Sequence, residues 1–151
     1  MTTKEEIIPR FEASLRDGWH GPSIFKLVEA LSLDEAMDRP LAHRHTIWEI
    51  LNHVVFWIDV AKQVLRGRAH PKIGELDDWP SMGVSAEEWR SSVRALTDSK
   101  RELVEAIRNF HKGFDEKIVP DDFTYGWMLE GLCNHNLYHT GQIIILRASN
   151  P

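Results

Sequence analysis

Hydrophobic residues recur at intervals of three and four along most of this 151-residue chain, and they alternate with polar residues almost nowhere. That spacing places apolar side chains on one face of a helix, whereas a half-buried strand requires alternation. The pattern therefore predicts an all-α protein with four helices and no sheet. The first helix begins between Thr3 and Pro9 and has a bend or restart at residues 18–22, and the others cover residues 46–65, 85–110 and 124–147.

Polar residues before the apolar stretches mark where helices begin. Thr46 and Glu49 have the spacing of a capping box, in which a hydroxyl and a carboxylate accept hydrogen bonds from the first free backbone N–H groups. Ser85 and Glu88 repeat this signal before the third helix. The stretch between the second and third helices, residues 66–84, is typical of a long connection because it contains Gly67, Pro71, Gly74, Pro80 and Gly83.

Composition and charge narrow the class of protein. Eighteen Lys and Arg against 23 Asp and Glu give a net charge of -5, and no basic run favours nucleic acid as a partner. The longest apolar stretches, 54–58 and 143–146, are far shorter than the ~18 residues of a membrane helix, and the N-terminus lacks the apolar region of a signal peptide. The single cysteine, Cys133, fits a reducing cytosol. We expect one cytoplasmic domain over residues 1–151, without nucleic-acid or membrane partners.

Histidine is the unusual feature of the composition, with eight residues. His135 and His139 are four residues apart, which places them on one face of the fourth helix and close enough to share a metal ion. The same inward-facing stripe contains Met128, Leu132, Gln142 and Leu146. Burying two imidazoles in a bundle without a partner is costly, and a metal ion would supply that partner. The alternative is a pair of surface or hydrogen-bonded histidines.

A third ligand is available on the second helix, where His53 lies on an otherwise apolar face. At a rise of ~1.5 Å per residue, His53 lies ~10 Å from the start of its helix, while His135 and His139 lie ~17–23 Å from the start of theirs. In helices with flush ends that span ~30 Å, the three side chains meet if the second and fourth helices are antiparallel. This condition favours a four-helix bundle of up-down-down-up topology, in which a long crossover joins the second and third helices.

Four residues near the mouth of this predicted site are candidates for the walls of a pocket. They are His43, His45, Trp57 and Trp79. A solvated loop is the alternative for the two histidines, and packing in the core or at a dimer interface is the alternative for the tryptophans.

Glu49 and Gln142 are the candidates for a catalytic role, and the sequence identifies no general base. Glu49 lies one turn before His53 and either accepts a hydrogen bond from it or serves only as a helix cap. Gln142 either orients a water or a ligand, or is an amide at the edge of the core. Cys133 points away from His135 on the helix, so we expect it to be buried by packing, and we interpret His70 as a loop residue.

Three segments resemble the DinB-like (damage-inducible) family. Residues 131–143, GLCNHNLYHTGQI, resemble its H-x-x-Y-H-x-G-Q-I signature, and residues 46–53 and 19–23 are similar to further parts of the pattern. The resemblance implies a four-helix bundle of up-down-down-up topology, a homodimer, and a divalent metal ion held by three histidines. At the matching positions these ligands are His53, His135 and His139, the set that the depth estimate selects.

The resemblance also implies activities. Some members of this superfamily are metal-dependent S-transferases that conjugate a low-molecular-weight thiol such as bacillithiol to an electrophile. Three histidines leave open positions on a divalent ion, zinc or nickel, where a thiol or water can lose its proton. We therefore predict a thiol transferase, with a metal-dependent hydrolase and a non-catalytic, metal-braced dimer acting in a stress response or in ligand binding as the alternatives.

Overall fold

The computed structural model describes residues 2–72, 77–119 and 121–149. The helices are α1 (Lys4–Ser14), α2 (Ile24–Glu29), α3 (Leu33–Met37), α4 (Ile47–Leu65), α5 (Ala86–Arg108) and α6 (Tyr125–Ala148). Within these described ranges there are isolated bridges but no strand, which confirms the all-α prediction. Gly74, one of the residues that predicted a long connection, lies outside the described residues.

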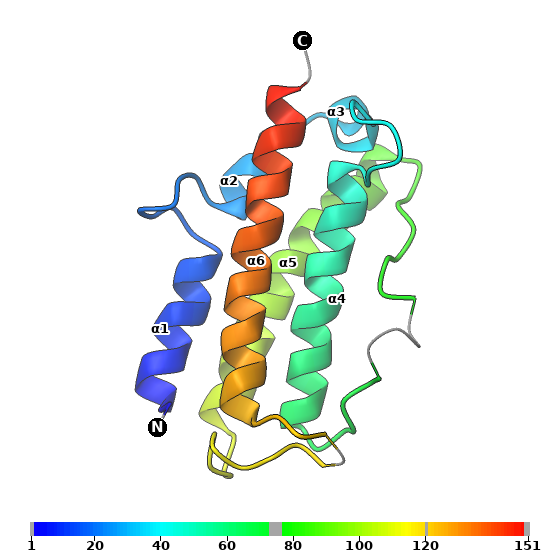
Figure 1. The fold of residues 1–151 in the computed structure, drawn as a ribbon. Coiled ribbons are helices and arrows are strands. Elements are labelled where there is room, and N and C mark those ends of the chain that lie inside the picture. Colours follow the sequence, from blue (N-terminus) through cyan, green and yellow to red (C-terminus); the bar gives the residue numbers. More distant parts are fainter. Residues whose placement is uncertain (1, 73–76, 120, 150–151) are drawn as a thin grey trace.

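The four longer helices lie side by side, and α2 and α3 lie near one end of them (Figure 1). In Figure 1, α1 and α6 run towards that end, whereas α4 and α5 begin there and run away from it. The connection between α4 and α5 therefore returns along the length of the molecule. The helix α4 packs against α5 and α6, and α6 also packs against α1.

The N-terminal third is more divided than the sequence predicts. Gly18 and Gly21 exchange backbone hydrogen bonds of 3.1 and 3.0 Å around a two-residue turn, and Gly21 adopts a φ of 118° that favours glycine. This turn separates α1 from α2, so the expected restart is observed. The five-residue helix α3 is an addition to the prediction, and Ser32 and Glu35 form its capping box.

Capping and burial explain where the long helices lie. Thr46 and Ser85 cap α4 and α5, and each forms a capping box with the predicted glutamate three residues later. The side chains of Leu51, Ile58 and other apolar residues of α4 are fully buried. Burial of each such side chain contributes about 1.5–3 kcal/mol before entropy is counted. The periodic apolar face of α4 therefore fixes which side of the helix meets α5 and α6.

Polar contacts join the helices at specific levels. The ammonium group of Lys62 on α4 is buried and donates hydrogen bonds to the carboxylates of Asp59 and Glu102, the second of which lies on α5. Between α6 and α1, the buried amide of Asn136 donates to the hydroxyl of Ser14 at 3.2 Å. Because a buried polar group without a partner is costly, these contacts favour one register between the helices.

No helix in the part of the chain that the structure describes is both long enough and apolar enough to span a membrane.

Candidate metal centre

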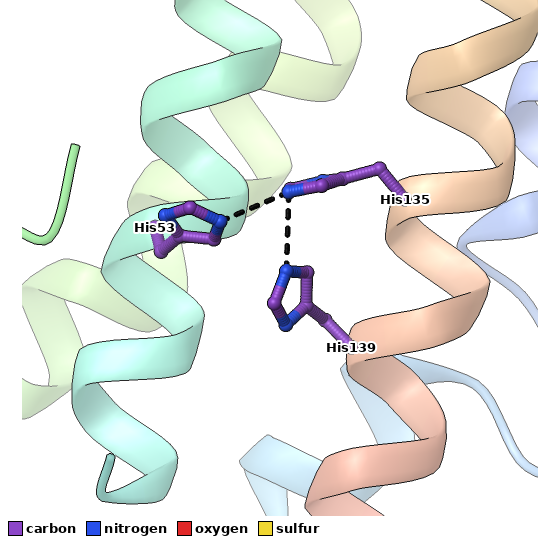
Figure 2. A group of neighbouring side chains, drawn as sticks. All are labelled: His53, His135 and His139. Carbon is purple, nitrogen blue, oxygen red and sulfur yellow. Dashed lines mark hydrogen bonds between the residues drawn. The ribbon is translucent and has the colours of Figure 1, made fainter. Parts of the chain in front are cut away.

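Three histidine side chains converge between α4 and α6. His53 extends from α4, and His135 and His139 extend from successive turns of α6 (Figure 2). The Nε2 atom of His135 lies 2.9 Å from Nε2 of His53 and 3.1 Å from Nε2 of His139. His53 and His139 are buried, and His135 is partly buried. The structure thus brings together the three residues that the sequence predicts as ligands, in a group that could hold a metal ion.

Hydrogen bonds on the outer side of two rings fix which nitrogen carries the proton. Nδ1 of His53 lies 2.7 Å from the backbone carbonyl oxygen of Asp78, and Nδ1 of His139 lies 2.7 Å from Oε1 of Gln142. Because both partners are acceptors, each Nδ1–H donates, and each Nε2 directs a lone pair into the cluster. Nδ1 of His135 is buried and has no hydrogen-bond partner among the described residues.

This arrangement fits a divalent metal ion. Nε2 of His135 faces the lone pairs on Nε2 of His53 and of His139. It carries at most one proton, so it cannot donate a full hydrogen bond to both, and lone pairs repel each other within the cluster. A cation would replace that repulsion with attraction to all three nitrogens. Zn–N bonds of about 2.0–2.1 Å, at angles of about 90–109°, place two ligand nitrogens about 2.8–3.4 Å apart. Two of the three separations, 2.9 and 3.1 Å, lie in that range, and all three ligand atoms lie within 4.8 Å of one another.

Burial keeps these imidazoles neutral. It lowers the pKa of His135 to about 3, and the adjacent His139 and His53 add to the shift. Burial also lowers the pKa of His139 to about 4, against the opposing effect of its hydrogen bond to Gln142. The pKa of His53 is lowered for the same reason. Since a neutral imidazole is the form that binds a metal, all three side chains are in the ligand form at neutral pH.

The end of the crossover holds His53 in place. Besides the carbonyl that faces His53, Asp78 offers a carboxylate oxygen that accepts a 3.1 Å hydrogen bond from Nε1 of Trp57. The ring of Trp79 stacks on His53 with centroids 3.9 Å apart and an angle of 8° between the planes. His45 also stacks on Trp79, with centroids 3.5 Å apart. Asp78 is a neighbour of the cluster that the sequence analysis missed, because it lies in irregular chain with no periodic signal.

The two catalytic candidates occupy different places. Gln142 contacts the cluster directly, because its side-chain oxygen accepts a hydrogen bond from Nδ1 of His139 and so holds that ring in one orientation. The carboxylate of Glu49 instead accepts hydrogen bonds from Arg39 and from the backbone of Thr46, and it is not part of the histidine group. The structure therefore places Glu49 in the cap and an ion pair, the alternative that the sequence left open.

Two pockets reach the cluster through different histidines. The larger, of ≈ 470 Å³, is lined by His139 and by Leu41, Arg44, His45, Ile50, Trp79, Tyr138, Gln142, Ile145 and Leu146. The smaller, of ≈ 220 Å³, is lined by His135 and by Trp57, Val60, Ala61, His70, Phe123, Trp127, Met128, Gly131 and Leu132. Three of the four predicted wall residues, His45, Trp57 and Trp79, thus line a pocket beside the cluster.

The remaining sequence candidates lie elsewhere or differ from expectation. His43 is exposed, has a φ of 61°, and lines neither pocket. Cys133 is buried, and burial raises the pKa of its thiol to about 11, in agreement with the predicted packing role. His70 is a loop residue as predicted, but its side chain is buried against Trp57 and Phe123.

A helical bundle with three convergent histidines defines the class of this protein. The sequence model of the DinB superfamily matches residues 20–143, which include all three histidines, the helices α2 to α5 and α6 up to residue 143. The chain belongs to the DinB superfamily. No curated protein and no solved structure matches the chain.

Proposed function

We propose that this protein is a metal-dependent transferase that conjugates a low-molecular-weight thiol of the bacillithiol type to an electrophile. One zinc or nickel ion is held by His53, His135 and His139 in an up-down-down-up bundle. The observation that carries the proposal is the open donor set: among the described residues, no fourth histidine, cysteine, aspartate or glutamate joins the group. Structural zinc sites are closed by four protein ligands, whereas catalytic sites keep a position for water or substrate.

A bound divalent ion would lower the pKa of an incoming thiol and so supply a thiolate near neutral pH. In the reaction, a sulfur–carbon bond forms and the bond between carbon and the leaving group breaks. The leaving group departs with its electron pair, and the thiol proton passes to solvent. The chain contributes orientation, since Asp78 and Gln142 fix the rings of His53 and His139.

The larger pocket suits the thiol. Its lining combines the guanidinium of Arg44 with the polar side chains of His45, Tyr138 and Gln142, and it reaches the cluster at His139. A thiol that carries carboxylates would find a cation there, and its sulfur would lie near the three Nε2 atoms. The cytoplasm is the proposed location because low-molecular-weight thiols stay reduced in that compartment.

The test uses untagged protein, stripped of metal and reloaded with zinc or nickel. Metal content is measured first by mass spectrometry, where about one ion per chain is expected for a three-histidine site and none for the triple alanine variant of the cluster. Conjugation of bacillithiol to monochlorobimane is then followed by fluorescence. We expect turnover that requires metal and thiol, that is lost in His139→Ala, and that persists in His43→Ala, a matched control outside both pockets.

Other outcomes select the alternatives. Hydrolysis of p-nitrophenyl acetate without any thiol, lost in His139→Ala, would replace the transferase with a hydrolase. Metal binding without turnover of either substrate would leave a metal-braced ligand-binding or stress-response protein. Turnover that is unchanged in His139→Ala would overturn every metal-dependent reading.

We also propose a homodimer formed through α6. Its exposed side includes Trp127, Tyr138 and Ile145, which are 60–64% exposed and are separated by 11 and 7 residues, close to whole helical turns. Large, mostly apolar side chains aligned on one helix face favour association with a second copy. Because Trp127 lines the smaller pocket and Tyr138 and Ile145 line the larger one, the second copy would border both pockets. Sedimentation equilibrium should give twice the chain mass, and Tyr138→Glu should shift it towards the monomer. A monomeric wild type would refute the proposal.

A further inference from the structure

The smaller pocket has a chemical character that metal binding does not require. Aromatic rings from three segments form its walls: Trp57 from α4, Phe123 from the loop before α6, and Trp127 from α6. The other side chains are aliphatic, apart from the two histidines His70 and His135. An apolar cavity of about 150 Å³ takes up benzene, so a pocket of ≈ 220 Å³ has room for one aromatic ring with small substituents.

His70 is the polar side chain of this pocket that has no role in the proposed metal site. Its side chain is 6% exposed, and its ring lies 6.3 Å from that of Trp57 and 5.0 Å from that of Phe123. Nδ1 of His70 is 3.9 Å from Oδ2 of Asp121, which is beyond hydrogen-bond distance. That carboxylate oxygen is buried and has no hydrogen-bond partner in the described part of the chain.

The mostly buried imidazole of His70 is the polar side chain that this otherwise apolar pocket presents besides His135, and no hydrogen bond within the described residues holds it. Packing alone would be served better by leucine or phenylalanine at position 70. A ligand that brings one hydroxyl group to His70 would give this imidazole a hydrogen-bond partner, while the nearby carboxylate of Asp121 would favour the tautomer with the proton on Nδ1 and a lone pair on Nε2. The aromatic walls would contact the rest of the ligand through their faces and edges.

We propose that this pocket binds a small uncharged aromatic molecule that carries a hydroxyl or similar hydrogen-bonding group, with His70 as the residue that positions this group. One further step rests on the proposed function: the aromatic molecule is the electrophile, which approaches the cluster at His135 while the thiol approaches at His139. Binding itself does not depend on that step, so it is measured without turnover.

The test compares 4-methylphenol with p-xylene, two probes of nearly equal shape that differ by a hydroxyl against a methyl group. Dissociation constants are measured on zinc-loaded protein by NMR, from the shifts of the tryptophan indole N–H signals. We expect both probes to bind, with 4-methylphenol the tighter. His70→Phe should weaken 4-methylphenol by about fivefold to tenfold, the loss expected for one hydrogen bond, and leave p-xylene unchanged.

A glycine pair on α6 tests the location. A Cβ atom added at either Gly131 or Gly141 meets nothing within 4 Å, so both accept a side chain, but only Gly131 lines the pocket. Gly131→Leu should weaken both probes at least tenfold, whereas Gly141→Leu should leave both constants unchanged. Equal effects of the two glycine substitutions, or equal loss of both probes in His70→Phe, would overturn the proposal. His139→Ala should keep probe binding although it abolishes turnover, which separates this inference from the proposed function.

Discussion

Acid should destabilise the metal-free protein through His135 and His139. In the folded chain their pKa values are about 3 and about 4, against an ordinary value of 6.5. As the pH falls below 6.5, these two histidines become protonated in the unfolded chain but stay neutral in the folded chain. The free energy of unfolding therefore falls with pH from 6.5 down to the folded pKa values and is constant below them.

The size of the effect follows from the same values. At pH 5, which lies between the folded and unfolded pKa values, each histidine favours the unfolded state by about 2 kcal/mol, because each pH unit in that window is worth about 1.4 kcal/mol. The two residues together lower the free energy of unfolding by about 4 kcal/mol between pH 7.5 and pH 5. This is a large part of the 5–15 kcal/mol that stabilises a typical domain, so the effect is well within reach of an unfolding measurement.

Urea unfolding followed by circular dichroism at 222 nm measures this loss, in buffers that contain EDTA. The double variant His135→Leu/His139→Leu lacks both groups, so its stability should fall about 4 kcal/mol less between the two pH values than that of the wild type. His43→Leu, which removes an exposed histidine, should behave as the wild type does. Equal pH dependence in the double variant and the wild type would refute the buried, neutral state of the cluster.

Three further outcomes are expected. Gln142→Leu removes the acceptor for Nδ1 of His139 and should weaken zinc binding about 10–100-fold in a chelator competition, and unchanged affinity would contradict the orienting role. Cys133, whose thiol pKa is raised to about 11 by burial, should react with Ellman's reagent at pH 8 far more slowly in the native protein than in urea, and similar rates would show that the thiol is accessible. Leu51→Ala, at a fully buried position, should lower the free energy of unfolding by about 2–5 kcal/mol, whereas Val84→Ala, at an exposed one, should change it by less than about 0.5 kcal/mol.

The long helices could be predicted because their signals are local and redundant. The capping boxes at Thr46 and Ser85 indicate where α4 and α5 begin, and the spacing of the apolar residues indicates which helix face is buried. The short helix α3 was missed because five residues contain little more than one turn, which is too few for a periodic signal. Its capping box at Ser32 and Glu35 was present in the sequence and was the one signal that could have identified it.

The histidine cluster could be predicted for a related reason. A helix has a fixed rise per residue, so the position of His53, His135 and His139 along their helices could be estimated from the sequence alone. The three side chains converge if α4 and α6 are neighbours and if the histidines lie at the same height along the bundle. In the structure the three side chains do meet, with Nε2 separations of 2.9 and 3.1 Å.

The positions of the residues around the cluster could not be estimated from the sequence in this way. Asp78 and Trp79, which hold His53, and His70, which lines the smaller pocket, all lie in the connection between α4 and α5, where the rise per residue is not fixed. The buried position of His70 depends on its contacts with Trp57 and Phe123, which are far from it in the sequence or separated by irregular chain. The sequence could therefore place the three histidines on their helices, whereas the contacts that surround them from the irregular connection required a structure.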